Sequence, residues 1–253
     1  MDLVAVRGIE HFSDAAKRKL VQVAAALGMH PDWLASIISF ETAGTFDPAK
    51  PNAAGSGAVG LIQFTPSTAR GMHTTTAALA AMSAEEQLDW VYKYLQPFAG
   101  RLTSLASSYL AVFLPRGMGK SADTVLIRRE DGEYPKNAPL DRGNKGYITV
   151  GDVVAAVTGV YQAGLARGRI PVLEQPPLAE APPPAWLSGQ SLEPSDSSSS
   201  GSIHGENDHD QVFRSRHCSQ LASANRRSDR TTGRNRGPRL GGRDHRPVRR
   251  SAS

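Results

Sequence analysis

The apolar residues of this 253-residue chain are concentrated in its first two thirds, and few lie beyond Val172. A segment folds only where burial of apolar side chains offsets the entropy lost when the chain is ordered. We therefore expect one folded domain over residues 1–170. Residues 171–210 are rich in Pro and Ser and predict an acidic linker, and residues 211–253 predict a disordered Arg-rich tail.

The charge is distributed as unevenly as the apolar residues. Residues 1–170 carry 17 Lys and Arg against 15 Asp and Glu, whereas residues 171–210 hold seven acids and residues 211–253 hold twelve arginines and two aspartates. The net charge of +5 therefore belongs to the tail. Nucleic-acid binding by such a block needs aromatic stacking groups, and Phe213 is the only one there, so we expect no nucleic-acid partner. The role of the tail, and whether it is read out of frame, stays open.

Cysteine content and targeting signals exclude several classes of protein. The single cysteine, Cys218, excludes an internal disulfide framework and a cysteine-rich zinc site, and the seven histidines show no metal-ligand spacing. No apolar run approaches the roughly 18 residues of a membrane span, and no Sec signal is visible at the N-terminus. We expect neither a metal nor a cofactor, and the localisation of the chain stays open.

Helical spacing of apolar residues dominates the first 170 residues. Ser13 can cap a first helix that ends at Gly28, and Pro31 opens a second helix that runs to about Ala43. Further helices are expected after Thr65-Pro66, after the capping box Ser83-x-x-Glu86, over residues 102–114, and after Thr149-x-x-Asp152. Residues 122–140 are charged and turn-rich, and no alternating strand pattern of useful length appears. The domain is therefore predicted to be mainly α.

One carboxylate is out of place in this pattern. Glu41 stands at the end of the second helix, one turn after Ile37, on a face whose other residues are apolar. Partial removal from water disfavours its charged form, which suits a general acid. The following segment, residues 44–57, is rich in Gly, Pro, Asn and Ala and is expected to be a functional loop.

Two motifs flank this loop: Phe-Glu-Thr-Ala-Gly-Thr-Phe-Asp-Pro over residues 40–48, and Ser-Gly-Ala-Val-Gly-Leu-Ile-Gln-Phe over residues 56–64. Together they resemble the catalytic region of the soluble lytic transglycosylases and goose-type lysozymes, in a form similar to phage-associated members. The resemblance implies a single lysozyme-like helical domain that cleaves peptidoglycan at the bacterial cell wall. It implies glycan strands as the substrate, no cofactor, and phage virion components as further partners.

The resemblance also assigns roles to residues. It implies that Glu41 is the catalytic acid and base and that Thr42, in place of the more usual Ser, lies beside it. It places Gly60, Gln63 and Phe64 along the sugar groove, where a Gln amide can pair with acetamido or hydroxyl groups without adding charge.

Two tyrosines are further candidates for substrate binding. Tyr109 corresponds to the Tyr of a family Ala-Tyr-Asn-Ala-Gly motif, although Leu110 replaces the Asn, and an ordinary core tyrosine is an equal alternative. Tyr147 is matched, on one residue alone, to a family Tyr near the end of the domain.

Glycosidases usually work with two carboxylates, and a partner for Glu41 is hard to find. Asp47 is the only acid between Glu41 and Glu85, and its Phe-Asp-Pro setting predicts a turn in which Asp caps its own backbone. This favours a transglycosylase, in which an intramolecular hydroxyl replaces water. A lysozyme-type hydrolase that uses Asp123 or Asp141 to activate water is the alternative. A third reading is a virion or cell-wall docking module without turnover.

Residues 141–152 partly match a calcium-binding loop. Gly146, Ile148 and Asp152 occupy its sixth, eighth and twelfth positions, but Gly143 and Lys145 stand at the third and fifth, which should donate oxygen ligands. We therefore do not expect calcium to bind.

Overall fold

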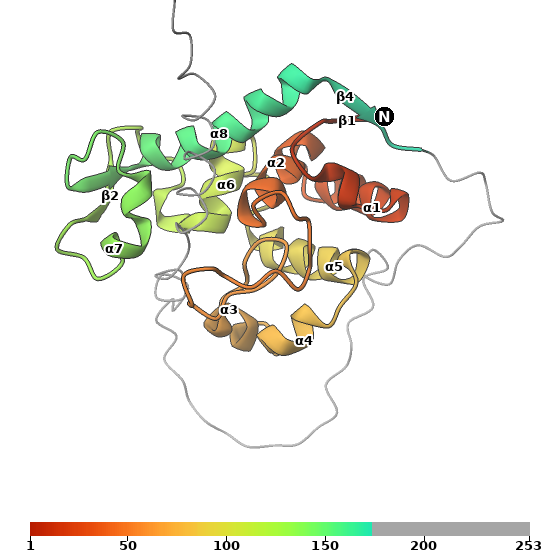
Figure 1. The fold of residues 1–253 in the computed structure, drawn as a ribbon, viewed down its shortest axis with the longest axis horizontal. Helices are drawn as coiled ribbons and strands as arrows, with labels where there is room; N and C mark the ends of the chain where they lie inside the picture. Colours follow the sequence, from red (N-terminus) through yellow and green to blue (C-terminus); the bar gives the residue numbers. More distant parts are fainter. Residues whose placement is uncertain (174–253) are drawn as a thin grey trace, which may run out of the picture.

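The computed structural model describes residues 1–173, which form a mainly helical domain (Figure 1). The α-helices are α1 (Asp14–Ala26), α2 (Pro31–Glu41), α3 (Pro66–Gly71), α4 (Thr76–Ala80), α5 (Ala84–Leu95), α6 (Leu105–Phe113), α7 (Tyr134–Asn137) and α8 (Val150–Arg167). Short 3-10 turns lie at Ile9–His11, Gln96–Phe98, Pro115–Gly117 and Ala138–Leu140. The predicted tail, and the predicted linker beyond residue 173, lie outside the described residues.

The helices begin where the capping signals place them. The Ser13 hydroxyl accepts a hydrogen bond from the Ala16 amide at the start of α1, and Pro31 occupies the first turn of α2. The capping boxes that open α5 and α8 are both formed. A side chain that satisfies an unpaired amide of the first turn fixes the start of a helix locally, so these predictions are confirmed.

Two helical segments differ from the prediction. The helix expected over residues 102–114 begins only at Leu105, because the Ser104 hydroxyl caps it by accepting from the amide of Ser107. The short helix α4 was not predicted at all. Its five residues include three alanines, which give no periodic apolar pattern to detect.

The mainly helical domain also contains four short strands within the described residues, which the sequence pattern did not indicate. Strand β1 (Asp2–Val4) pairs antiparallel with β4 (Arg169–Pro171), and β2 (Val125–Arg128) pairs antiparallel with β3 (Tyr147–Thr149). Each strand has three or four residues, so none is long enough to show an alternating pattern. The charged and turn-rich segment 122–140 contains strand β2 and helix α7 in addition to its turns.

Helix α2 lies at the centre of the domain. It packs against α1, α6, α8 and β1, and Figure 1 shows α8 running across the ends of α6 and α2. Ten of its eleven residues are buried, including Asp32, Ser36 and Ser39. A helix covered on all sides carries few charged groups, and its two carboxylates, Asp32 and Glu41, stand at opposite ends.

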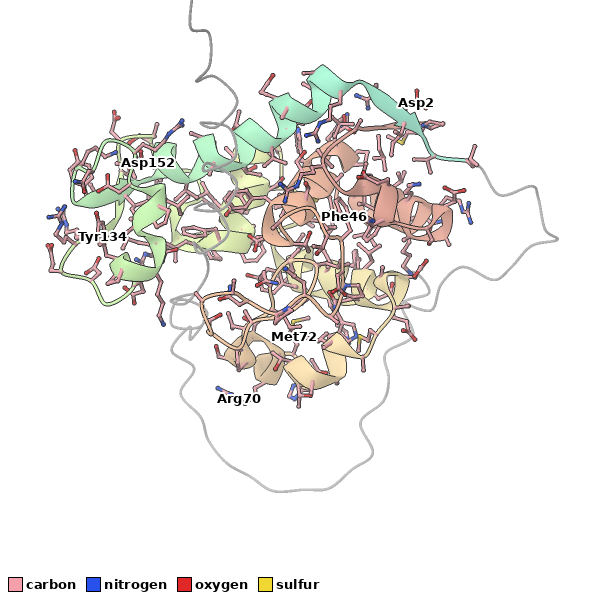
Figure 2. All side chains as sticks on the ribbon, in the orientation of Figure 1. Asp2, Phe46, Arg70, Met72, Tyr134 and Asp152 are labelled. Carbon is pink, nitrogen blue, oxygen red and sulfur yellow. The ribbon has the colours of Figure 1, made fainter. Side chains whose placement is uncertain are left out.

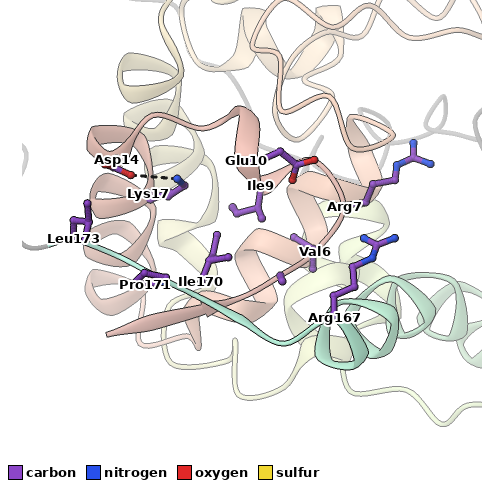
Figure 3. A pocket seen from close by; sticks show the side chains of 11 residues that line it. Val6, Arg7, Ile9, Glu10, Asp14, Lys17, Arg167, Ile170, Pro171 and Leu173 are labelled. Atoms are coloured by element: carbon purple, nitrogen blue, oxygen red, sulfur yellow. Dashed lines mark hydrogen bonds and ion pairs between the residues drawn. The ribbon is translucent and has the colours of Figure 1, made fainter.

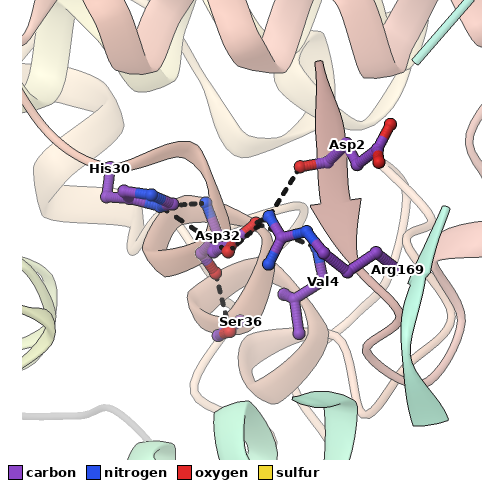
Figure 4. A network of polar contacts seen from close by, with 6 residues as sticks. All are labelled: Asp2, Val4, His30, Asp32, Ser36 and Arg169. Carbon is purple, nitrogen blue, oxygen red and sulfur yellow. Dashed lines mark hydrogen bonds and ion pairs between the residues drawn. The ribbon is translucent and has the colours of Figure 1, made fainter. Parts of the chain in front are cut away.

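The carboxylate at the start of α2 is neutralised by a residue from the end of the domain. Asp32 Oδ2 accepts a hydrogen bond of 2.9 Å from Arg169 Nη2, and Asp32 Oδ1 accepts one of 2.9 Å from the Val4 amide (Figure 4). The same guanidinium nitrogen donates to the carbonyl of Asp2. This network joins β1 and β4 to α2, and a buried carboxylate with such partners is satisfied in both charge and hydrogen bonding.

The described domain continues slightly beyond the expected boundary at residue 170. Strand β4 reaches Pro171, and the amide of Val172 donates to the carbonyl of Met1. Within residues 1–173 there is no helix whose length and apolar content would let it cross a membrane.

Candidate active site

Glu41 is the last residue of α2, and its side chain is 0% exposed. The helix ends in a Schellman motif: the amide of Gly44 donates to the carbonyl of Ser39 at 2.7 Å, and the amide of Ala43 donates to that of Phe40 at 3.2 Å. Ala43 adopts the left-handed conformation, with φ of 53°, that glycine usually supplies in this motif. The turn that follows Glu41 is therefore both hydrogen-bonded and strained.

The N-terminal segment that contains Arg7 and Gly8 packs against this turn and holds it in place. Gly8 and Gly44 approach so closely that a Cβ on Gly8 would lie 1.8 Å from the carbonyl oxygen of Gly44. The guanidinium of Arg7 donates to the carbonyl of Ala43, and the hydroxyl of Ser39 donates to the carbonyl of Arg7 at 2.7 Å. The position of Glu41 is thus set by the segment after β1 as well as by its own helix.

Thr42, predicted to lie beside the acid, is fully buried and holds the same turn. Its hydroxyl donates to the carbonyl of Ile38 at 2.7 Å and accepts from the amide of Phe46 at 3.0 Å. Phe46 in turn packs edge-on against Phe12, with ring centroids 4.7 Å apart. The hydroxyl is therefore engaged with backbone groups, and a substrate-binding role for Thr42 stays a prediction.

The predicted groove residues Gly60 and Gln63 form the inside of the following loop. Gly60 has φ of 86°, and its amide donates to the carbonyl of Lys50 at 2.9 Å. Gln63 is 0% exposed, donates through Nε2 to the carbonyls of Lys50 and Gly60, and accepts through Oε1 from Asn52. The structure thus brings these two residues together, with the Gln63 amide turned inward to tie the loop to itself.

Gln87 was not singled out from the sequence, although it organises this loop. This buried residue of α5 accepts from the amide of Leu61 at 2.6 Å and donates to the carbonyls of Pro48 and Leu79. A Cβ on Gly60 would lie 2.3 Å from Gln87 Oε1, so glycine is required there. A signal was present: Gln87 stands one turn before Val91, a polar residue on a face that is otherwise apolar.

The aromatic candidates are core residues that pack around α2 and the loop. Phe64 is 0% exposed and lies edge-on to Tyr94, with ring centroids 6.1 Å apart. Tyr109 on α6 is also 0% exposed, and its ring lies 5.4 Å from that of Phe40, the neighbour of Glu41, and 5.8 Å from that of Phe113. Tyr109 is therefore placed against the residue beside the candidate acid.

Tyr147 lies in another part of the molecule. It begins β3, is 36% exposed, and has the Lys145 ammonium 5.0 Å from its ring centroid. Figure 1 shows the lobe that contains β2 and α7 at one side of the molecule. Figure 2 shows Phe46, five residues after Glu41, outside this lobe and near the middle of the described domain. Tyr147 pairs with Arg128 of β2 and contacts Lys145, both of which belong to this lobe.

The carboxylates considered as partners for Glu41 have local roles or are exposed. Asp47 Oδ1 accepts from the amide of Ala49 at 2.8 Å, which is the self-capping turn that the Phe-Asp-Pro setting predicts. Asp141 accepts from the hydroxyl of Tyr134 and from two backbone amides of its own loop. Asp123 is exposed in the turn before β2.

A cavity of about 620 Å³ lies between α1, the end of α8, β4 and the segment after β1 (Figure 3). Val6, Ile9 and Ile170 form part of its apolar lining, and Arg7 and Arg167 stand at one side. Glu41 does not line this cavity. The acids that line the cavity, Glu10 and Asp14, are exposed, whereas the candidate acid Glu41 is buried.

No family model matches this chain, and neither a curated protein nor a solved structure matches it. Any function must therefore be argued from the residues themselves.

Proposed function

We propose that this chain is a lytic transglycosylase of peptidoglycan, built on a single lysozyme-like α domain, with Glu41 as its one catalytic acid and base. The observation that carries the proposal is the fully buried Glu41 carboxyl group at the end of a core helix, directly before a loop with a strained backbone. The motif resemblance of residues 40–48 and 56–64 supplies the substrate class.

The position of Glu41 supports a functional reason for its presence. Burying a carboxyl side chain in a core costs free energy that an apolar residue would not cost, so such residues are rare outside paired or reactive sites. The backbone around it also carries strain: of five non-glycine residues with positive φ in residues 1–173, three are Ala43, Phe46 and Gln63. Strain of this kind persists where surrounding structure enforces it, and it clusters at active sites.

The proposed reaction uses Glu41 twice. In its protonated form it donates the proton to the oxygen that bridges N-acetylmuramic acid and N-acetylglucosamine, and the bond from the muramoyl C1 to that oxygen breaks. The resulting carboxylate then takes the proton from the C6 hydroxyl of the same muramoyl residue, whose oxygen bonds to C1. The product is a 1,6-anhydro sugar, no water is consumed, and Glu41 is protonated again.

The partner carboxylates support this route over hydrolysis. A water nucleophile needs a base, whereas the C6 hydroxyl is already held beside the reacting carbon at high effective concentration. Of the carboxylates considered as partners for Glu41, Asp47 and Asp141 accept hydrogen bonds from backbone amides of their own turns.

The burial of Glu41 sets a condition on substrate binding. A carboxyl group at 0% exposure touches a glycan only after the side chains that cover it move.

The decisive measurement is mass spectrometry of the muropeptides released from purified cell walls. We expect products that end in 1,6-anhydro muramoyl groups. Products heavier by one water per cleavage would replace the proposal with the hydrolase, and Asp123 and Asp141 would then be the first residues to test. Binding to the walls without any release would identify a docking module.

Glu41→Gln tests the assigned residue. The amide is nearly isosteric but cannot exchange the proton, so turnover should fall by about 100-fold or more while the circular dichroism spectrum is unchanged. The matched control is Glu130→Gln, at an exposed position of the turn after β2, which should leave turnover unaltered. A Glu41→Gln protein that retains wild-type turnover would remove Glu41 from the mechanism.

A further inference from the structure

The loop of residues 141–152 lies between two helical segments and matches a calcium-binding loop at some of its sequence positions. It begins directly after the 3-10 turn Ala138–Leu140 and ends in the first turn of α8. Asp141 occupies its first position and Asp152 its twelfth, and these are the two ends from which carboxylates approach the ion in a calcium loop. Ile148, at the eighth position, lies in β3 and pairs with Ile127 of β2.

The side chain at the fifth position is a lysine rather than an oxygen donor. Lys145 Nζ lies 2.6 Å from Asp152 Oδ2 and forms an ion pair with it, and the ammonium lies 5.0 Å from the ring centroid of Tyr147. The Lys145 amide also donates to Asp141 Oδ1 at 2.9 Å. One residue therefore contacts the carboxylates at both ends of the loop.

The loop itself makes further hydrogen bonds to these carboxylates. Asp152 Oδ2 accepts from the amide and the hydroxyl of Thr149, both at 2.8 Å, and Asp141 Oδ2 accepts from the amide of Gly146 at 2.7 Å. In residues 1–173, no three His, Cys, Asp or Glu side chains gather as a metal site. The donor set therefore does not fit calcium, which takes six to eight oxygen ligands.

We propose that the Lys145 ammonium is the resident cation of this loop and replaces a bound metal ion in holding Asp152 and the start of α8. The loop is then a metal-independent form of a cation-binding loop. This inference rests on the ion pair and the loop positions, and it is independent of the proposed enzymatic function.

The electrostatics of the pair agree with this arrangement. The hydrogen bond to Asp152 raises the pKa of Lys145 above its usual value, against a smaller effect of burial. Burial opposes ionisation of Asp152, but the hydrogen bonds from Lys145 and Thr149 outweigh it and lower the pKa of that carboxyl. Both groups are thus charged at neutral pH.

The location of the loop gives it a structural effect beyond its own residues. Asp152 is 6% exposed and forms the capping box of α8 with Thr149. Helix α8 packs against α2 and α6, and Figure 2 shows Asp152 and Tyr134 in the lobe at its start. The charge of Lys145 therefore stabilises the end of a helix that covers the core.

The first test is the response of the full chain to calcium. We expect the same melting temperature in EDTA and in about 10 mM CaCl₂, far above the dissociation constants of most such loops. A calcium-dependent rise of the wild-type melting temperature would overturn the proposal, because it would show that a metal occupies the loop.

The second test converts the loop. In Gly143→Asn/Lys145→Asp both substituted positions supply oxygen ligands, and Asn tolerates the positive φ of 90° at position 143 better than most residues do. We expect this variant to melt below wild type in EDTA. With a dissociation constant of roughly 1 mM, about 10 mM CaCl₂ should raise its melting temperature by about 3–6 °C. Absence of any calcium response would overturn the claim that the loop has cation-binding geometry.

Single substitutions keep the proposal testable if the double variant does not fold. Lys145→Met removes the charge and should lower the melting temperature, Lys145→Arg should restore most of it, and the exposed control Lys120→Met should have no effect. A Lys145→Met protein as stable as wild type would show that the ammonium does not hold the loop.

Discussion

The turn after Glu41 and the loop of residues 141–152 differ in the side chains that hydrogen-bond their backbones. Both are irregular segments next to a core helix, and both must satisfy many backbone amides and carbonyls. Around Glu41 and the loop that follows it, the hydroxyl of Thr42 and the amides of Gln63 and Gln87 are neutral partners, and the guanidinium of Arg7 adds one charged donor to the carbonyl of Ala43. In the 141–152 loop they are charged: Asp141, Lys145 and Asp152.

The difference has a physical reason. Charged partners near the Glu41 carboxyl group would interact with it directly, and interactions between charges are strong where water is excluded. Neutral amides fix most of this backbone without adding a charge, which suits the proposed role of Glu41 in proton transfer. The loop of residues 141–152 is more exposed, so charges cost less free energy there.

Removal of the Gln87 side chain should have the largest effect on stability. Gln87→Ala breaks three hydrogen bonds and leaves the amide of Leu61 buried without its acceptor, so we expect a loss of about 3 kcal/mol in the free energy of unfolding. Urea denaturation measures this loss. Gln162→Ala, at an exposed position of α8, is the matched control and should stay within about 0.5 kcal/mol of wild type. Equal stability of the two variants would contradict the role of Gln87.

Removal of the Asp141 carboxylate from the loop of residues 141–152 should cost less free energy of unfolding. Asp141→Ala removes acceptors for Tyr134, Lys145 and Gly146, but water reaches this partly exposed site, so we expect a loss of about 1–2 kcal/mol. Turnover on cell walls should be retained at a temperature where the variant is folded. A variant that is folded yet inactive would instead give Asp141 a catalytic role, as the hydrolase alternative requires.

The pH dependence of stability should report on the charged loop of residues 141–152. Burial opposes ionisation of Asp141, but hydrogen bonds from Tyr134, Lys145 and Gly146 lower its pKa, as that of Asp152 is lowered. A lowered carboxyl pKa stabilises the fold above the unfolded value of about 3.9, and this stability is lost as the pH falls through the folded value. The raised pKa of Lys145 stabilises the fold below about pH 10.4, and this contribution is lost as the pH rises further.

Melting temperatures measured from about pH 2 to about pH 11 report on both the acidic and the alkaline loss of stability. Lys145→Met should lack the alkaline contribution of this loop. Identical pH profiles for this variant and wild type would contradict the assignment.

The smallest effect should be a gain of stability. Ala43→Gly relieves a left-handed alanine, and we expect the free energy of unfolding to rise by about 0.5–1 kcal/mol. Ala25→Gly, at an exposed position inside α1, should lower it by about 1 kcal/mol. The same substitution should thus have opposite signs at the two sites, and equal signs would show that the turn after Glu41 is not strained.

The sequence predicted what local chemistry determines. The starts of α1, α2, α5 and α8 follow from one capping residue or one proline each, and the helical class of the domain follows from apolar spacing. The anomaly of Glu41 on an apolar face corresponds to a fully buried carboxyl group.

Features that depend on distant partners could not be predicted in this way. The strands β1 and β4 are three residues each and form only because the two ends of the domain meet. The sequence shows that Gln63 is polar, but only the fold shows that its amide faces Lys50 and Gly60 instead of the solvent. The Arg169 partner of Asp32 is 137 residues away, beyond the reach of any local pattern.

That separation has a consequence for synthesis of the protein. A ribosome that adds roughly 5–20 residues per second makes Asp32 about 7–27 s before Arg169. During this time the carboxylate at the start of the helix that carries Glu41 lacks its counter-charge, and an unpaired charge opposes burial of that helix. We therefore expect the central helix to reach its final packing only after β4 has left the ribosome.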